Sequence, residues 1–489
     1  MLSGDDRAFF RLVSEAAFAN PFSEARLKLD SAIADGPRGA ARPADFTRTL
    51  QTVSARLAKL GERGKDLARY PADDRTLVEH AVLFDVFHRF MSRFDAFIFE
   101  QHADGERSLR VPFAREAIKI LTESGFQRGA AVRNFALFFQ LRRAFFFIEQ
   151  SLPGASSSMR RVRERLWNNL FTVDGRLYAR SLWRRMEDFS TFLVGETGTG
   201  KGTAAAAIGR AAFIPFDDKT ETFAASFEKG FVSINLSQFP ETLLESELFG
   251  HTRGAFTGAA TAHDGVFSRC SAHGAIFLDE IGEASAPVQV KLLRVLQERT
   301  FSPVGGHEVL RFKGRVVAAT NRSLPELRER SLRDDFYYRL CSDVILVPPL
   351  RERLAEDPRE LGALVRVILG RILGDGSEAG AQEGLTRLVT EAIERDLGAG
   401  YAWPGNVREL EQCVRRVLLT GRYEGDTRAP RAGLTDVGLL DIVGDETARG
   451  LTIRYCQALY ARHGSYEDVA RRTGLDRRTV KAHVLARTP

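Results

Sequence analysis

Residues 191–203 read Thr-Phe-Leu-Val-Gly-Glu-Thr-Gly-Thr-Gly-Lys-Gly-Thr. The apolar run at 191–194 is typical of a buried strand, and the alanine-rich run at 203–210 is typical of a helix. A glycine-rich loop in this setting turns its backbone N–H groups inward around phosphates, and the helix N-terminus adds a favourable dipole. A glycine-rich turn followed by a chance lysine is the alternative, and it leaves the flanking strand and helix unexplained. The stretch therefore predicts an α/β fold with a phosphate-binding loop made of Gly195, Glu196, Thr197, Gly198, Thr199, Gly200, Lys201, Gly202 and Thr203.

Two carboxylates follow a second apolar run, Ala275–Leu278. Asp279 at the strand tip suits Mg²⁺ held through its water shell, and Glu280 is placed to orient or deprotonate an attacking water. Position 202 is glycine where the general motif has a hydroxyl for Mg²⁺, so we expect the metal to depend on Asp279 or on the threonine that follows. Asn321 ends another β-type run and is a candidate sensor of the γ-phosphate. Exposed acids after a strand and a turn-starting asparagine are the alternatives for these residues taken singly.

The remaining pattern predicts several domains. β-type runs at 231–234 and 315–319 alternate with helical patterns, which is typical of a parallel α/β sheet. Apolar residues recur at helical spacing before about residue 150, and we expect the many phenylalanines there to form a core rather than a ligand pocket. This helical pattern argues against a phosphorylatable receiver domain. The pattern divides the chain into a helical N-terminal domain, an α/β core, a second helical region, a linker and a basic helical C-terminal domain, at residues 1–150, 155–355, 356–423, 424–445 and 446–489 respectively. A regulatory role for the first, an ATPase role for the second and a lid role for the third are implied by the resemblance that the segment at 245–259 introduces.

The bulk composition narrows the class of protein and its location. The chain has 489 residues, a formal net charge of +6 and a pI near 9.2, a mild excess that permits nucleic-acid binding without establishing it. Its four cysteines are far apart and lack a CxxC pair, which favours reduced cytosolic thiols over disulfides or zinc. The N-terminus lacks a signal-peptide pattern, and the most apolar run, Ala144–Ile148, is too short to span a membrane. We expect a cytoplasmic protein with no membrane partner.

The segment at 245–259, Glu-Ser-Glu-Leu-Phe-Gly-His-Thr-Arg-Gly-Ala-Phe-Thr-Gly-Ala, resembles the signature loop of the sigma-54-dependent transcriptional activators, which are AAA+ ATPases. The resemblance covers about 155–423 closely and 446–489 more loosely. Small residues surround one aromatic side chain, Phe256, and one hydroxyl, Thr257, a combination that suits a contact loop better than a core. The resemblance implies that this contact loop engages the sigma-54 factor through Gly254, Ala255, Phe256, Thr257, Gly258 and Ala259.

The same resemblance implies roles for residues outside the loop. Asn235 resembles the family's switch asparagine, which holds the catalytic glutamate, here Glu280. Arg333 and Arg339 resemble arginine fingers that act in trans on a neighbouring subunit's γ-phosphate, which requires a ring; exposed salt bridges are the alternative for both. Arg408, in Trp-Pro-Gly-Asn-Val-Arg-Glu-Leu, resembles the lid arginine that contacts nucleotide in its own subunit. The glycine at position 202 departs from the family as well, which usually has an acidic residue there.

The C-terminal segment predicts a helix-turn-helix. Tyr466–Thr473 and Arg477–Val484 have helical patterns on either side of a Gly-Leu-Asp turn. The start and exposed face of the second helix carry the residue types that contact bases and phosphates of double-stranded DNA. A small basic helical cap without a role on DNA is the alternative. The predicted contacts are Arg477, Arg478, Thr479, Lys481 and His483.

These features together predict a transcriptional activator that uses ATP and Mg²⁺. Its homo-oligomeric ring, a hexamer in the family, would hydrolyse ATP between subunits and remodel sigma-54-bound RNA polymerase while the C-terminal domain binds DNA. Two other functions remain open at this point: a non-enzymatic DNA-binding regulator that keeps ATP as a structural ligand, and an AAA+ motor acting on DNA junctions or on another protein.

Overall fold

The computed structural model describes residues 1–35, 45–61, 67–374, 379–398, 400–425 and 448–486. The chain divides into two compact units, of which the first comprises Met1–Asp396 with Trp403–Gly425 and the second contains the C-terminal helices. Most of the expected linker at 424–445 lies outside the described residues. No helix within the described ranges is both long enough and apolar enough to cross a membrane.

The first unit is built on a five-stranded parallel sheet in the order β4-β5-β8-β1-β9. The expected parallel α/β sheet is thereby confirmed, and four of its strands coincide with the β-type runs of the sequence; β9 is an additional edge strand. The strands are β1 Thr191–Val194, β4 Phe231–Asn235, β5 Ala275–Asp279, β8 Arg315–Thr320 and β9 Asp343–Leu346.

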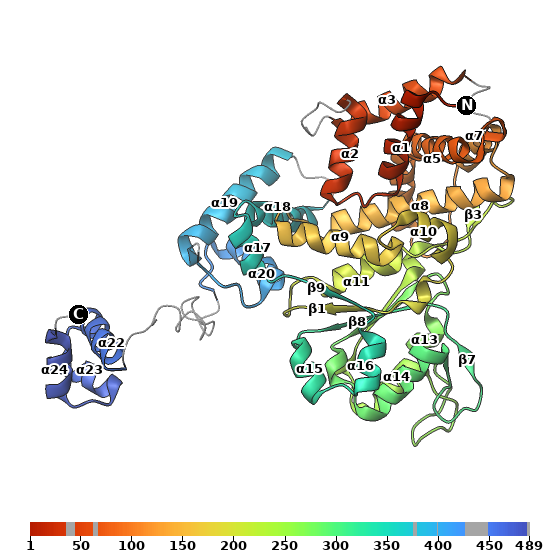
Figure 1. The fold of residues 1–489 in the computed structure, drawn as a ribbon. Helices are drawn as coiled ribbons and strands as arrows, with labels where there is room; N and C mark the ends of the chain where they lie inside the picture. Colours follow the sequence, from red (N-terminus) through yellow and green to blue (C-terminus); the bar gives the residue numbers. More distant parts are fainter. Residues whose placement is uncertain (36–44, 62–66, 375–378, 399, 426–447, 487–489) are drawn as a thin grey trace. The chain divides into compact units, whose positions relative to one another are not determined.

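Successive side chains of a strand pack into two separate hydrophobic cores, because side chains alternate between the two faces of a sheet. On β1, Leu193 joins a cluster with α11 (Lys201–Arg210), whereas Phe192 joins the cluster on the opposite face. The opposite face is covered by α14 (Ala286–Glu298) and α16 (Asp334–Leu340), as Figure 1 shows. Both faces are therefore covered, and the ends of the strands are where a site can form.

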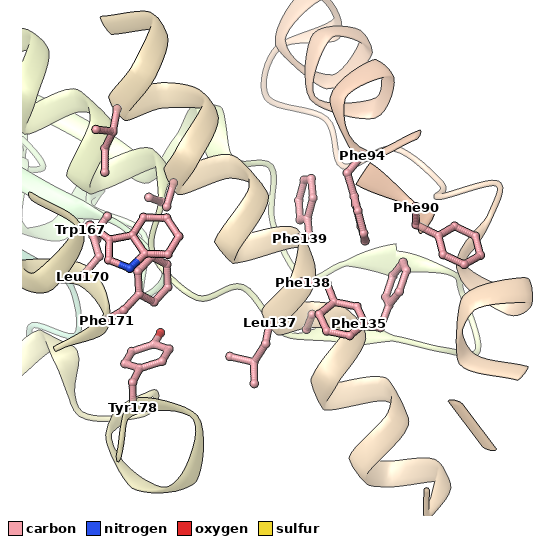
Figure 2. Packing of buried hydrophobic residues seen from close by; sticks show 14 of the residues in the cluster. Phe90, Phe94, Phe135, Leu137, Phe138, Phe139, Trp167, Leu170, Phe171 and Tyr178 are labelled. Carbon is pink, nitrogen blue, oxygen red and sulfur yellow. The ribbon is translucent and has the colours of Figure 1, made fainter. Parts of the chain in front are cut away.

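The N-terminal region is helical, as expected. Its helices are α1 Gly4–Phe18, α2 Glu24–Asp35, α3 Asp45–Lys59, α5 Ala72–Arg89, α6 Met91–Asp104, α7 Ala114–Glu123, α8 Arg128–Ser151 and α9 Ser157–Phe171. Its phenylalanines form a core, as the sequence predicts: Figure 2 shows rings of α8 near Phe94 of α6 and near Phe90 between α5 and α6, and a second group with Trp167 and Tyr178. The close pairs include Phe94 with Phe135, whose ring centroids lie 5.5 Å apart.

This core continues into the α/β part of the unit, which the sequence predicts to be an ATPase core. Helix α8 packs on α11, and the fully buried Arg143 of α8 donates hydrogen bonds to the carbonyl oxygens of Arg210 and Ala212 at 2.6 and 2.8 Å. The neighbouring Gln140 donates to the carbonyl of Ala211 at 3.0 Å. A cation and an amide thus satisfy the carbonyl of the last residue of α11 and the two carbonyls that follow it, at the end where the helix dipole is negative. The N-terminal region and the ATPase core form one body.

A short hairpin strengthens this junction. Strands β2 (Phe216–Asp217) and β3 (Thr222–Phe223) pair antiparallel between α11 and β4. The Phe223 ring stacks on Phe139 of α8 at 4.2 Å, and the Phe216 ring meets Phe135 edge-on at 4.8 Å. The hairpin belongs in sequence to the ATPase core and packs into the N-terminal helices.

Further elements complete the first unit. Between the strands lie α12 Glu241–Phe249, α13 Val266–Arg269, α15 Leu324–Arg330 and a hairpin of β6 Thr300–Phe301 with β7 Leu310–Arg311. The lid contains α17 Leu350–Glu356, α18 Glu360–Leu373, α19 Ala379–Leu397 and α20 Asn406–Thr420. A buried ion pair between Arg353 and Glu360 joins α17 to α18.

The second unit is a small helical bundle of α22 (Ala448–His463), α23 (Tyr466–Thr473) and α24 (Arg477–Leu485). Cys456, Val469 and Val480, one from each helix, form its core. The side chain of Asp476 caps α24 by accepting backbone N–H bonds at 2.9 and 3.0 Å. The three helices agree with the expected C-terminal pattern, and the assignment as a DNA-binding helix-turn-helix stays a prediction.

Candidate nucleotide site and contact loop

A cleft of about 330 Å³ opens where β1 and β5 end and α11 begins. The carboxyl edge of a parallel sheet is where open α/β folds bind ligands. The structure brings most of the expected nucleotide-binding residues together there. The expected residues that line it are Thr197, Gly198, Thr199, Gly200, Lys201, Gly202, Thr203, Asn235, Asp279, Glu280 and Arg408.

The phosphate-binding loop is tightly constrained. Gly198 has φ +80°, and a β-carbon there would lie 2.2 Å from the carbonyl oxygen of Gly405, so only glycine fits. Lys201 is buried at the start of α11, and its Nζ donates to the carbonyls of Gly195 and Glu196 at 2.7 and 3.0 Å. Burial lowers the pKa of Lys201, and the negative charges of the nearby carboxylates oppose that change. The ammonium is therefore placed for an anionic ligand.

Two carboxylates end β5 in the same cleft. Glu280 has a left-handed backbone with φ +54°, and its N–H donates to the Asp279 carboxylate at 3.1 Å. Burial, together with the charge of Asp279, raises the pKa of Glu280, while a backbone hydrogen bond from Asn321 acts in the opposite direction. A carboxylate with a raised pKa is a better proton acceptor. The donor set, an ammonium, a helix N-terminus and two acids, fits ATP with Mg²⁺.

The two asparagines with predicted roles in catalysis and phosphate sensing are Asn235, which lines this cleft, and Asn321, which lies next to it. The Asn321 side chain donates a long hydrogen bond of 3.4 Å to Thr197, and its backbone N–H reaches Glu280. The side-chain oxygen of Asn235 accepts hydrogen bonds from the N–H and hydroxyl of Ser237 at 2.9 and 2.7 Å. The expected hold of Asn235 on Glu280 stays a prediction.

The lid contacts the phosphate-binding loop through Asn406 and Arg351, which were not among the predicted site residues. Buried Asn406 accepts a hydrogen bond from the N–H of Leu350 and donates to the Glu196 carboxylate and the Thr197 carbonyl. Arg351 pairs with Glu196 at 2.5 and 2.8 Å, which lowers the pKa of that carboxyl. An asparagine directly after Pro-Gly and before a helical run was the available signal, because asparagine tolerates positive φ and caps turns. Hydrogen bonds within the protein alone thus hold the lid on the phosphate-binding loop.

The end of the N-terminal region also reaches the cleft. Leu152 and Pro153, directly after α8, line it beside Ile368 of the lid. The Pro153 carbonyl accepts a hydrogen bond from Arg353 at 2.8 Å. This segment supplies apolar surface of the kind that a nucleobase requires.

The two predicted arginine fingers are not among the residues that line this cleft. Arg333 precedes α16 and is exposed, paired with Asp335 at 2.9 Å. Arg339, on the same helix, donates to the carbonyl of Leu296 at 2.9 and 3.1 Å. Within one chain both arginines make local contacts, and action on a neighbouring subunit stays a prediction.

The contact loop is closed by its own backbone. The Gly254 N–H donates to the Ala259 carbonyl at 2.8 Å, and the Ala259 N–H donates to the Phe256 carbonyl at 3.0 Å. Phe256 is 38% exposed and rests edge-on against the ring of His251 at 4.9 Å. Thr257 and the following glycine are exposed, whereas Ala259 is buried. The aromatic side chain is therefore offered to solvent on a folded support.

The support comes partly from the turn between β6 and β7. Gly305 has φ +74°, and a β-carbon there would lie 2.7 Å from the side chain of Ala255. The N–H of Thr252 also donates to the carbonyl of Val304 at 3.0 Å. The position of the contact loop thus depends on this turn.

Comparison with known proteins agrees with this geometry. Residues 179–345 match the model of the family described as the sigma-54 interaction domain. The chain is 42% identical over 276 residues to a Nif-specific regulatory protein of Azotobacter vinelandii, covering 53% of this chain and 48% of that one. It is 38% identical over 303 residues to the transcriptional regulatory protein ZraR of Klebsiella oxytoca, covering 60% and 63%.

A solved structure of NtrX from Brucella abortus in complex with ATP is 20% identical and covers 76% of this chain and 80% of its own, with a TM-score of 0.40. Similarity at that level carries no functional argument. The chain spans about half the length of the curated relatives that it matches. Residues 179–345 are thus a sigma-54 interaction domain, and the chain's relatives are sigma-54-dependent activators of the AAA+ type.

Proposed function

We propose that this chain hydrolyses ATP in a homo-hexameric ring and uses the energy to remodel sigma-54-bound RNA polymerase. The observation that carries the proposal is a pairing within one compact unit: a cleft with Lys201, Asp279 and Glu280, and an exposed aromatic on the contact loop. The match of residues 179–345 to the sigma-54 interaction domain supports the choice of partner.

The cleft supports a division of roles. Lys201 and the N-terminus of α11 bind the phosphates, and Asp279 holds Mg²⁺, which neutralises charge on the phosphates when bound. Glu280, whose pKa is raised by burial, orients a water and accepts its proton. Arg408 reaches the nucleotide from the lid. Arg333 and Arg339 complete the site of a neighbouring subunit, which is why the proposal requires a ring.

The second unit supplies the proposed DNA contact. Arg477, Arg478 and Lys481 are exposed on α24, and Thr479 and His483 are half-buried on the same helix. Exposed cations at the start of a helix suit phosphates and base edges of the major groove. We infer that this unit holds the ring near a promoter.

ATP turnover is the first test. Wild type should hydrolyse ATP, and Glu280→Gln should lose at least about 100-fold in turnover while it still binds nucleotide. Glu298→Gln, an exposed acid paired with Arg294, is the matched control and should keep wild-type turnover. No turnover in wild type at high protein concentration would refute the motor and favour a regulator that keeps ATP as a structural ligand.

Binding to sigma-54 is the second test. In the presence of ADP with aluminium fluoride, wild type should retain sigma-54, whereas Phe256→Ala should not, although its ATP turnover stays within about twofold of wild type. Leu419→Ala, which removes an exposed aliphatic side chain from the lid, is the control and should bind normally. Turnover without any sigma-54 binding would favour a motor that acts on another target.

A further inference from the structure

A second cleft, of about 1000 Å³, opens at the opposite edge of the sheet from the nucleotide site. It lies beside the amino ends of β5 and β8, with Ala275 and Arg315 in its wall. Helix α8 contributes Arg133, α11 contributes Ile208, and Ala212 follows two residues after the end of α11. We call it the basal cleft. Its volume is at the upper end of the range of small-molecule sites.

Four basic side chains gather around the basal cleft: Arg133, Arg184, Arg311 and Lys313. All four are exposed, and none has an ion pair within the described part of the chain. The lining contains a single acid, Glu187. Other arginines of α8 behave differently, since Arg128 and Arg142 pair with aspartates at 2.8 and 2.5 Å. Glu79 lies near enough to Arg133 to feel its charge, so acids offset part of the positive charge. Four cations against one lining acid still leave an excess that favours an anion in the cleft.

The other polar groups in the wall do not offset this charge. Arg315 is buried, and its guanidinium donates to the Phe189 carbonyl and to Asn169 and Thr191. His273 is half-buried, and burial lowers its pKa, so it is neutral near pH 7. The free cations therefore lie on the rim.

The inside of the basal cleft is apolar and aromatic. The Trp183 ring meets Phe213 edge-on at 4.6 Å, and the Arg184 guanidinium lies 4.3 Å from the centre of the Trp183 ring. Ile208 and Phe216 also line it. A cation next to an indole suits a ligand with a planar apolar body and an acidic group.

We propose that the basal cleft binds a small organic anion with an apolar body. Such a ligand touches α8 of the N-terminal region and the end of α11, the helix whose other end holds the phosphate-binding loop. The inference goes beyond the proposed function and concerns ligand binding alone. Its failure would leave ATP hydrolysis and sigma-54 binding untouched.

The test uses the full chain and the probe 8-anilinonaphthalene-1-sulfonate, with ADP saturating to fill the nucleotide site. The neutral analogue N-phenyl-1-naphthylamine lacks only the sulfonate. We expect saturable binding of the anionic probe to one site, at least about tenfold tighter than that of the neutral one. Excitation of tryptophan should sensitise probe emission. Trp183→Phe should reduce that signal, and Trp167, which lies near Tyr178 of the lining, supplies the remainder.

Charge reversal locates the site. The double variant Arg311→Glu with Lys313→Glu should weaken the anionic probe by at least about tenfold and change the neutral probe by less than twofold. The matched control, Arg415→Glu with Arg416→Glu, reverses two exposed cations on the lid and should leave both affinities unchanged. Arg133→Gln is a milder variant that keeps the test valid if the double variant misfolds.

Four results would overturn the proposal. They are loss of probe binding when ADP is saturating, equal affinity for the neutral analogue, unchanged affinity after charge reversal at the rim, and sensitised emission that is undiminished in Trp183→Phe. Each would place the probe somewhere other than the basal cleft or show that the rim charge does not select it.

Discussion

Asn406 offers the sharpest test of how the lid and the phosphate-binding loop work together. Its side chain accepts a hydrogen bond from the N–H of Leu350 at 2.7 Å and donates to Glu196 at 3.1 Å and to the Thr197 carbonyl at 3.0 Å. Asn406→Gly removes all three bonds, at about 1 kcal/mol each, for a cost of about 3 kcal/mol. Because φ at this position is +52°, Asn406→Ala adds about 1 kcal/mol of backbone strain.

Binding of a fluorescent N-methylanthraniloyl derivative of ADP measures this cost. Nucleotide binds to the conformation in which the lid is docked on the loop. If the lost free energy destabilises that conformation, the Kd for the nucleotide rises about 100-fold for Asn406→Gly and further for Asn406→Ala. Arg415→Ala changes an exposed position of the same helix and should bind as wild type does. The reasoning fails if both Asn406 variants bind within twofold of wild type, or if alanine is tolerated better than glycine.

Three further predictions concern the loop, the N-terminal region and the second unit. Gly305→Val should displace the contact loop through its contact with Ala255 and weaken sigma-54 binding at least about tenfold in a pull-down titration, with ATP turnover unchanged. His88 has its pKa lowered by burial from 6.5 to about 3, so the unfolded chain binds more protons between these values and stability falls as pH drops. Urea unfolding at pH 7 and pH 5 should show a loss smaller by about 2 kcal/mol in His88→Leu than in wild type, and equal losses would contradict the assignment. Lys481→Ala should reduce the slope of log K against log salt for a DNA duplex by about 1, and an unchanged slope would remove this residue from the DNA contact.

The parts of the site that could be predicted are those whose residues are contiguous. The phosphate-binding loop at 195–203 and the pair Asp279 and Glu280 are local patterns, and a strand before each of them fixes the edge of the sheet at which they lie. Asn406 was missed because its partners lie about 200 residues earlier in the chain. The contribution of a buried amide to stability depends on the polar groups with which it forms hydrogen bonds, and the local sequence does not reveal those groups.

Local patterns also predicted individual helices and strands of the fold, whereas contacts between distant segments could not be predicted. β9 is four residues long and runs into Val-Pro-Pro, so its sequence suggests a connection, and its partner β1 is distant in the chain. Helical periodicity showed that α8 has an apolar face. It could not show that this face covers α11, because periodicity identifies a buried side and not its partner.

The junction of α8 with α11 means that the α/β part of the first unit is not a separable module. Cutting the chain near residue 155 would remove Arg143 and Gln140 from the end of α11 and would uncover Phe216 and Phe223, whose aromatic partners lie on α8. Grafting another regulator onto the remaining core would leave the same gap. The two parts therefore depend on each other for a complete core, and Phe216 and Phe223 are the residues through which that dependence is largest.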